Sequence, residues 1–508
     1  MDIFIFKAFW PELFLSLSLI FLLLFDSQLI NNLKFQFPVL ESEIFFQVYT
    51  ILFYVFLLFL NNEILGYDSN FFFLNDLTSL NVKSFFSGFC LLFFVIIWRS
   101  FVVQKLNFFE YFIILLLAIL SLFFLSSSFN LLSIYLCLEL QSISFYVLAS
   151  FQRNSIFSSE AGLKYFISSS LISGIFLLGC AFIYGGYGTL NLHSINILNI
   201  VEFSESYQLI INFITFGSFC ILGTFLFKLV IAPFHFWFPQ IYDGAPLSAT
   251  IIFSTLPKII LFTLFLRFWS IISPLLYFSQ TILFFIGVFS IFFGLLKALK
   301  QKRLKKLYIY SSISQMGLPL CALVDNSIES FTIVYFFLFI YLLTSVLMWG
   351  TFVLINANQN KVYLNSKNKI NTYPVFISSL KSLIINNPTL ALAFLFLFFS
   401  LAGIPPFAGF LSKIYVYFAL IQGNKYEIAS IIFYVSAFGV YYYIKILKIM
   451  FYENVSLTSH IKGQSSFNSA NLDLDYTLCA LVMFLLLFLC FFPNLIYMNA
   501  AQLVFYSF

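Results

Sequence analysis

The chain has 508 residues, of which 62% are hydrophobic and only 9% are charged, and its formal net charge is +5. This composition excludes an ordinary water-soluble protein and is typical of a polytopic membrane protein without a soluble domain that has its own core. The seven cysteines form no CxxC pair and the three histidines lie far apart, so the sequence predicts no metal site and no iron–sulfur cluster.

Apolar runs recur along the whole chain at the length that a membrane-crossing helix needs, roughly 17–25 residues. They predict an all-α fold with about 14 transmembrane helices, near residues 9–25, 44–61, 84–98, 108–125, 130–150, 161–186, 209–238, 248–268, 275–296, 307–324, 331–356, 389–421, 427–450 and 477–497. The two longest polar connections, 357–388 and 451–476, are expected to be surface loops.

The basic residues predict the orientation of these helices. An even number of spans puts both termini on one side of the membrane. Seventeen of the basic residues that we place in loops or at helix ends lie on the opposite side, six of them in the cluster 297–306. Only four lie on the terminal side, namely Lys7, Lys83, Arg267 and Lys425. The positive-inside rule therefore puts both termini outside, toward an intermembrane space or periplasm.

Two of the apolar runs contain residues that break a helix. Pro233 interrupts the seventh run, and Gly403, Pro405 and Pro406 interrupt the twelfth. Proline removes a backbone donor and clashes with the preceding turn. A broken helix is tolerated inside a membrane only where it lines protein or a hydrated cavity. These positions therefore indicate a site inside the protein.

The spacing of the two breaks predicts an internal repeat. The seventh and twelfth helices are five apart, and interrupted helices at corresponding positions are typical of inverted repeats in transporters. We expect two inverted five-helix repeats. The predicted organisation is three N-terminal helices in 1–107, the first repeat in 108–268, the second in 269–450, and a loop with the last helix in 451–508.

Ionisable residues inside the spans are the main functional candidates. A charged side chain at the centre of a membrane helix costs at least about 2.5–3.5 kcal/mol, so such residues usually face a protein or water-filled interior. Each candidate also has a structural interpretation. A lysine, above all Lys164, could extend its ammonium to the membrane surface, and Glu139 could be a buried acid that only stabilises the packing. His235 is either a proton relay or a packed side chain. The candidates inside the spans are Glu139, Lys164, Lys228, Lys258 and Lys413.

These residue types favour proton transfer without redox chemistry. Desolvation disfavours the charged form of a buried lysine or glutamate, and a nearby opposite charge favours it. A glutamate–lysine pair that forms and separates can therefore change the proton affinity of the next lysine.

Around these candidates the chain resembles the NADH dehydrogenase subunit 2 family, the antiporter-like membrane subunits of mitochondrial respiratory complex I. The resemblance covers residues 130–415. The matching stretches include Leu-Cys-Leu-Glu139-Leu-Gln-Ser, Glu160-Ala-Gly-Leu-Lys164-Tyr-Phe, Phe-Lys228-Leu-Val-Ile-Ala-Pro-Phe-His235-Phe-Trp, Pro257-Lys258 and Leu401-Ala-Gly-Ile-Pro-Pro-Phe-Ala-Gly-Phe-Leu-Ser-Lys413.

The resemblance implies proton translocation coupled to NADH oxidation and ubiquinone reduction, both catalysed in other subunits. Glu139 and Lys164 would form a charged pair, Lys228 and Lys258 would carry protons with His235 as an intermediate, and Lys413 would connect to the neighbouring subunit. This chain would itself bind no NADH, FMN, iron–sulfur cluster or ubiquinone.

The same resemblance implies the setting of the chain. It would lie in the mitochondrial inner membrane with both termini toward the intermembrane space. Its partners would be other membrane-arm subunits, with subunit 4 and subunit 4L as neighbours, and lipids such as cardiolipin, but no nucleic acid. The alternatives are an Mrp-type cation/proton antiporter subunit, which would couple protons without quinone, and a structural membrane scaffold, which would not need the buried charges.

Overall fold

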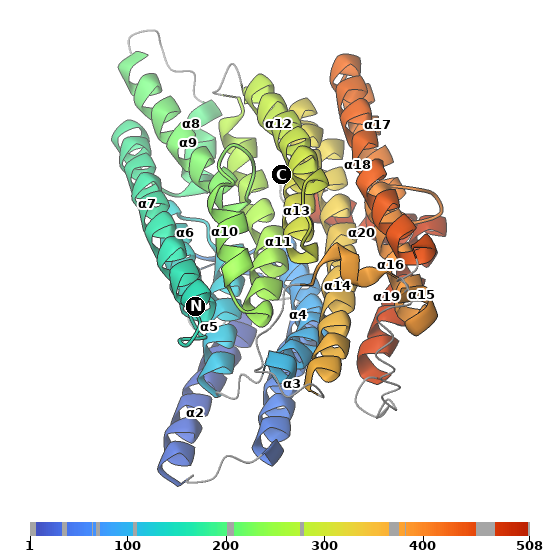
Figure 1. Cartoon of the computed structure of the whole chain (residues 1–508). Helices are drawn as coiled ribbons and strands as arrows, with labels where there is room; N and C mark the ends of the chain where they lie inside the picture. Colours follow the sequence, from blue (N-terminus) through green and yellow to red (C-terminus); the bar gives the residue numbers. More distant parts are fainter. Residues whose placement is uncertain are drawn as a thin grey trace. The chain divides into compact units, whose positions relative to one another are not determined.

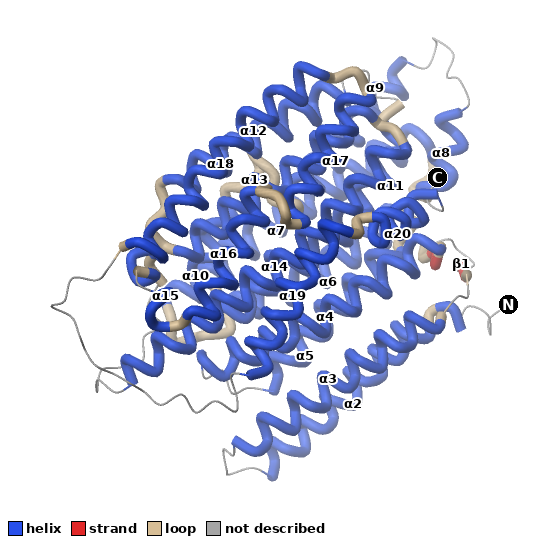
Figure 2. Tube along the Cα trace, turned by 90° about the vertical axis from the view of Figure 1, so that its right-hand side faces the viewer, coloured by secondary structure: helices blue, strands red, loops and turns tan. Residues whose placement is uncertain are grey.

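The computed structural model describes residues 7–32, 38–62, 65–67, 72–104, 109–200, 208–274, 279–364, 375–381, 383–453 and 473–505. These residues are almost entirely helical, as the tube in Figure 2 shows. Ten of the described helices are long and apolar enough to cross a membrane. The all-α, multi-pass class is therefore confirmed, as expected where only internal hydrogen bonds can satisfy the backbone. The count of about fourteen spans stays a prediction.

The elements follow one another along the chain as α2 (Trp10–Asn32), α3 (Pro38–Asn61), β1 (Gly66–Tyr67), β2 (Leu74–Asn75), α4 (Leu77–Gln104), α5 (Phe109–Ser127), α6 (Leu131–Ala149), α7 (Ile156–Tyr187), α8 (Leu192–Ile200), α9 (Gln208–Lys228), α10 (Trp237–Gly244), α11 (Leu247–Ile272), α12 (Ser279–Leu299), α13 (Leu304–Ala322), η2 (Leu323–Asp325), α14 (Ile328–Leu364), η3 (Ile377–Leu380), α15 (Leu383–Asn386), α16 (Pro388–Ala402), α17 (Ala408–Gln422), α18 (Tyr426–Tyr452), α19 (Asp473–Phe491) and α20 (Asn494–Phe505). The short strands β1 and β2 pair antiparallel.

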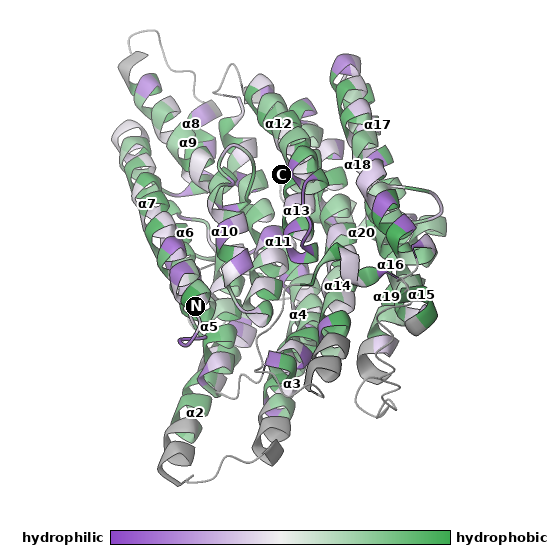
Figure 3. Ribbon diagram, viewed as in Figure 1, coloured by the Kyte–Doolittle hydropathy of each residue, from purple (hydrophilic) through white to green (hydrophobic). Residues whose placement is uncertain are grey.

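The described residues fall into two compact units. The first takes its residues from Met1–Phe94, Leu106–Gln280 and Gln502–Phe508, and the second from Val95–Lys105 and Thr281–Ala501. In the first unit α7 lies against α9 (Figure 1), and in the second α14 packs against α17 and α19. Hydrophobic residues predominate along the helices, with isolated hydrophilic positions between them (Figure 3).

The helix α9 ends in a hydrogen-bonded turn directly after Lys228. The Val230 N–H donates to the Phe227 oxygen at 3.1 Å, and the Ile231 N–H donates to the Leu226 oxygen at 3.0 Å. These are the two bonds of a Schellman motif, which needs a left-handed residue and usually has glycine there. Here Val230 takes that conformation, with φ 63°. A β-branched residue in this conformation costs about 1–2 kcal/mol, so backbone strain is stored at the break.

The helix α16 ends in the same motif without that strain. The Gly403 N–H donates to the Ser400 oxygen at 3.1 Å, and the Ile404 N–H donates to the Phe399 oxygen at 3.0 Å. Glycine adopts the required φ of 77° at no steric cost.

Prolines follow both helix ends. Pro233 lies between α9 and α10, and Pro405 and Pro406 lie between α16 and α17. Because proline cannot complete the hydrogen bonds of a continuing helix, each segment stays broken until the next helix begins.

The C-terminal span differs from its prediction. A single helix was expected over 477–497, but α19 ends at Phe491 and α20 follows at an angle of 81°. Pro493 is the reason, because the residue before a proline avoids the helical conformation. The short helix α8 and the β1–β2 pair were not predicted either.

The prediction that Lys83 lies in a loop or at a helix end is wrong. The helix α4 begins at Leu77, seven residues before the predicted start of that span, and Lys83 is fully buried in it. The Lys83 ammonium pairs with Glu12 of α2, which is also fully buried, and donates to the Asn75 side-chain oxygen at 2.5 Å. The polar residues around Asn75 look like a loop in the sequence. In the structure Asn75 and Lys83 are buried beside Glu12 and are therefore part of the core.

This ion pair predicts a coupled effect on stability. Removing one partner of a buried ion pair leaves an unpaired charge and costs about 3–5 kcal/mol, whereas replacing both by apolar residues is often neutral. We expect Glu12→Leu and Lys83→Met each to lower the amount and the thermal midpoint of the assembled protein in membranes. The double variant should recover most of both. Equal losses in the double and single variants would contradict the pairing.

Gly409 predicts a second effect, at the crossing of α16 and α17. A Cβ added at Gly409 would overlap the backbone oxygen of Ser400, which cannot move without displacing its helix. We expect Gly409→Ala to lower stability by about 1–3 kcal/mol, measured as thermal unfolding in detergent. Gly174→Ala is the matched control, because nothing lies within 4 Å of an added Cβ there. A Gly409→Ala protein as stable as the control would show that the crossing is not this close.

Candidate functional site

A small cavity in the first unit brings two of the predicted lysines together. Lys228 and Lys258 both line this cavity, which has a volume of about 20 Å³. A cavity of this size holds about one water molecule. The other side chains around it come from α6, α7, α10 and α11 and include Gln141, Tyr165 and Trp237. The two lysines, 30 residues apart in sequence, therefore share one buried cavity.

Lys258 is the more deeply placed of the two lysines. It lies in α11, whose most apolar stretch is completely buried, and only 2% of Lys258 is exposed. Its ammonium lies 5.8 Å from the centre of the Phe238 ring. A cation over an aromatic face is attracted to it, which offsets part of the cost of burial.

Lys228 is the last residue of α9, directly before the strained turn. A cation is favoured at the C-terminal end of a helix, where the backbone carbonyls carry partial negative charge. The Lys228 ammonium also interacts electrostatically with the Glu139 carboxylate of α6. Lys228 therefore lines the cavity that it shares with Lys258 and is influenced by the charge of Glu139.

Glu139 and Lys164 do not form an ion pair with each other in the described residues. Glu139 is half-buried and accepts a hydrogen bond from the Ser142 hydroxyl at 3.2 Å. Lys164 pairs with Glu160, one turn earlier on α7, at 2.6 Å, because residues four apart lie on the same face of a helix. The two side chains of this pair are 44% and 52% exposed. The pairing of Glu139 with Lys164 stays a prediction.

His235 lies in the segment between α9 and α10 and is 3% exposed. Its ring lies 4.7 Å from that of Phe236. It is not among the residues that line the cavity of Lys228 and Lys258. The structure therefore does not bring His235 to this cavity, and its role as a proton relay stays a prediction.

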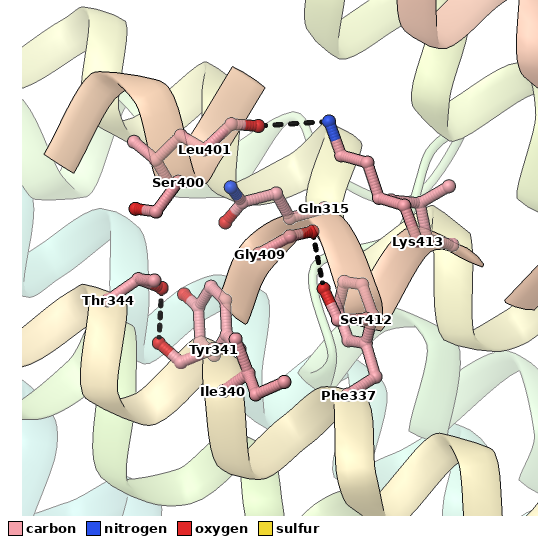
Figure 4. Close-up of a pocket in the computed structure, with 11 residues that line it drawn as sticks. Gln315, Phe337, Ile340, Tyr341, Thr344, Ser400, Leu401, Gly409, Ser412 and Lys413 are labelled. Carbon is pink, nitrogen blue, oxygen red and sulfur yellow. Dashed lines mark hydrogen bonds between the residues drawn. The ribbon is translucent and has the colours of Figure 1, made fainter. Parts of the chain in front are cut away.

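A second cavity, in the other unit, surrounds Lys413. It also measures about 20 Å³, and residues of α13, α14, α16 and α17 line it. The Lys413 ammonium donates to the backbone oxygens of Leu401 and Ala402, at 3.0 Å and 2.8 Å. A lysine of α17 thus satisfies the last carbonyls of α16. Figure 4 shows this contact and, close to it, the side chain of Gln315, which lines the same cavity.

Gly403 is suited to this contact in two ways. Its left-handed backbone closes α16, and a Cβ there would come within 2.8 Å of the Lys413 side chain. The glycine therefore leaves the space that the lysine needs to reach the end of α16.

Arg267, which the sequence analysis placed at the end of a helix, belongs to a polar group that was not predicted. The Arg267 guanidinium lies 3.5 Å from the Asp76 carboxylate and donates to the Thr78 hydroxyl at 2.8 Å and to the Ser126 oxygen at 3.0 Å. Burial raises the pKa of the Asp76 carboxyl, although Arg267 and Lys83 act in the opposite direction. An arginine near the end of an apolar run was the only sequence signal for this group.

Within the described ranges, no group of three or more histidine, cysteine, aspartate or glutamate side chains could hold a metal ion. That the chain binds no cofactor stays a prediction. The chemistry available at the two cavities is that of protonatable lysines, an amide and hydroxyl groups around a space of water size. Such an arrangement can bind and release protons.

The chain is similar in sequence to subunits of NADH-quinone and NADH-ubiquinone oxidoreductases. NADH-quinone oxidoreductase subunit N of Pelagibacter ubique is 36% identical over 308 residues, which are 60% of this chain and 61% of that protein. NADH-ubiquinone oxidoreductase chain 2 of Oenothera berteroana is 36% identical over 308 residues, 60% of this chain and 59% of that protein. The match thus spans about three fifths of the length of each relative.

Solved structures share the fold over nearly the whole length. A chain of respiratory complex I from Thermus thermophilus with bound aureothin has a TM-score of 0.72 at 24% identity, with 97% of this chain and 99% of that chain covered. A chain of the Mrp complex from Dietzia has a TM-score of 0.80 at 16% identity, with 98% and 97% covered.

The family comparison agrees with these likenesses. Residues 128–439, more than half of the chain, match the family described as NADH:quinone oxidoreductase/Mrp antiporter, TM. The matched residues contain both cavities with their three lysines and both broken helices. This chain therefore belongs to the NADH:quinone oxidoreductase/Mrp antiporter family.

Proposed function

We propose that this chain is a proton-translocating membrane-arm subunit of respiratory complex I, equivalent to the relatives named subunit N and chain 2. In this role it couples NADH:ubiquinone oxidoreduction, catalysed in other subunits, to proton movement. The observation that carries the proposal is the shared cavity of Lys228 and Lys258, because two lysines around one water-sized space can pass a proton between them. The chain is then part of an enzyme without holding its redox centre.

The electrostatics of the cavity explain how a proton could be moved. Burial favours the neutral amine of a lysine, and an opposite charge, such as that of the Glu139 carboxylate, favours the ammonium. Any change that strengthens or screens the effect of the Glu139 charge on Lys228 would change which of the two lysines holds the proton. Lys164 would act by pairing with Glu139 in one state and with Glu160 in another, and His235 would be an intermediate.

We further propose that the chain contains two inverted five-helix repeats, in 108–268 and 269–450. Three N-terminal helices in 1–107 precede them, and a loop with the last helix follows in 451–508. The support is that each proposed repeat has one broken helix, that both breaks begin with the same Schellman motif, and that each has a lysine beside a small cavity. In this scheme Lys413 connects the chain to the next subunit.

The exposed charges of α7 support a place inside an assembly. The Glu160–Lys164 pair is about half exposed within a helix that is apolar enough to cross a membrane. Charges facing lipid are costly, so a neighbouring subunit is expected to cover this face. We propose subunit 4 and subunit 4L as neighbours. Cardiolipin would bind at the basic cluster 297–306.

The same assembly gives the proposed location. It is the mitochondrial inner membrane, with both termini toward the intermembrane space. NADH, FMN, iron–sulfur clusters and ubiquinone would be used by the other subunits of the complex, and none would be bound by this chain.

An Mrp-type cation/proton antiporter subunit is the second candidate. The fold shared with the Mrp complex from Dietzia favours it. The two functions differ in what drives proton movement. Proton uptake that requires NADH and quinone supports the complex I role, and uptake that follows a sodium or potassium gradient without quinone supports the antiporter.

The central test replaces Lys258 by an uncharged side chain of similar length. In respiratory membranes that carry the assembled complex, we expect Lys258→Met to lower both quinone reduction and proton translocation by at least about a hundredfold, the usual contribution of a proton-transfer group. The measurements are the rate of NADH-dependent quinone reduction and the quenching of a pH-sensitive dye.

Lys445→Met is the matched control, because Lys445 is exposed on α18 and lines neither cavity. The control should leave both rates near normal. Normal quinone reduction and normal pumping in an assembled Lys258→Met complex would rule out a role for Lys258 in proton transfer.

A further inference from the structure

The glutamine Gln141 faces the cavity of Lys228 and Lys258 and was not among the predicted site residues. It lies in α6, only 3% of it is exposed, and it lines the cavity together with both lysines. Its side-chain oxygen is buried and has no hydrogen-bond partner among the described residues. Buried polar atoms in proteins almost always have a partner, so this oxygen points to a bound molecule.

The cavity limits what that molecule can be. About 20 Å³ is room for a water molecule and too little for an organic ligand. A lysine ammonium has three donors and no acceptor, so Lys228 and Lys258 cannot hydrogen-bond to each other while both are protonated. A water molecule between them can accept from an ammonium and donate to an amide oxygen.

The amide of Gln141 gives such a water molecule one orientation. If one O–H of the water donates to the Gln141 oxygen, a lone pair can accept from the ammonium of one lysine and the second O–H can donate to the neutral amine of the other. This orientation lets the water take a proton from one lysine and give its own second proton to the other. Glutamine does not titrate, so Gln141 would hold the water without storing the proton itself.

The second cavity has the same construction. It is lined by Gln315 of α13, Tyr341 of α14 and Lys413 of α17, and the first is lined by Gln141 of α6, Tyr165 of α7 and Lys228 of α9. In both, the glutamine and the tyrosine come from consecutive helices and the lysine from a broken one. Figure 4 shows Gln315 beside Ser400 and Gly409 in the second cavity. The same combination of a glutamine, a tyrosine and a lysine in two separate cavities supports a functional role for Gln141 in the first.

We propose that Gln141 is a positioning residue that binds a water molecule between Lys228 and Lys258. This inference rests on the proposed proton-translocating function. It adds that the path between the two lysines of the first cavity runs through one oriented water and depends on an amide.

The test compares two variants of Gln141 in the assembled complex. Gln141→Met keeps the length of the side chain and removes the amide, and Gln141→Asn keeps an amide. We expect Gln141→Met to lower coupled quinone reduction and proton translocation about tenfold, the effect of losing one hydrogen bond to a charged relay. We expect Gln141→Asn to restore part of both rates. The loss in Gln141→Met should be accompanied by a changed solvent deuterium isotope effect.

A purely structural Gln141 gives a different result. Replacing a buried, unpartnered amide by an apolar side chain of the same length would then leave the rates unchanged and could raise stability. Ser144→Ala is the matched control on the same helix, because it removes a buried hydroxyl that bonds to the Gln141 backbone oxygen and does not line the cavity. It should leave the rates and the isotope effect near normal.

A second measurement reads the water directly. A high-resolution electron cryomicroscopy map of the complex should contain an ordered water within hydrogen-bond distance of the Gln141 side-chain oxygen, and the map of Gln141→Met should lack it. No water there, or normal rates in Gln141→Met, would overturn the inference. Normal rates in Gln141→Met combined with lost rates in Lys228→Met would overturn the role of Gln141 alone. Normal rates in both variants would overturn the proposed function as well.

Discussion

A lysine ammonium that enters the hydrocarbon of a membrane must replace its lost water with other acceptors or give up its proton. The described buried lysines are accommodated in different ways. Lys83 pairs with Glu12, Lys413 donates to the carbonyls at the end of α16, and Lys228 and Lys258 share a cavity. Lys228, Lys258 and Lys413 each line a cavity of about 20 Å³, whereas Lys83 is held by the carboxylate of Glu12. That difference separates a structural lysine from one that is suited to exchange its proton.

The broken helices make these arrangements possible. In lipid a continuous helix satisfies its own carbonyls, so none is available to a lysine in mid-membrane. Ending α16 at Gly403 exposes the carbonyls that Lys413 uses, and ending α9 after Lys228 opens the end of that helix beside the cavity. The cost appears as the strained backbone of Val230. In each unit the helix break and the lysine beside it therefore act together: the break exposes the end of a helix next to a buried lysine and its cavity.

The breaks and the lysines could be predicted from the sequence because prolines and charged residues are rare inside apolar runs and therefore stand out there. It did not predict the Glu12–Lys83 pair, because the polar residues around Asn75 look like a loop until α2 covers them. The 81° bend between α19 and α20 was also missed, although Pro493 marks it. Gln141 could not be identified because a glutamine between apolar residues has no special signal, and only the cavity shows what it faces.

The central claim is that Lys258 must release its proton during turnover, rather than only supply a positive charge. The most direct measurement is therefore the coupled rate of a Lys258→Arg complex, since arginine keeps the charge but is not deprotonated in proteins. The account predicts that quinone reduction and proton translocation fall in the assembled Lys258→Arg complex. Rates close to normal would contradict it, because a permanent positive charge at this position would then be sufficient.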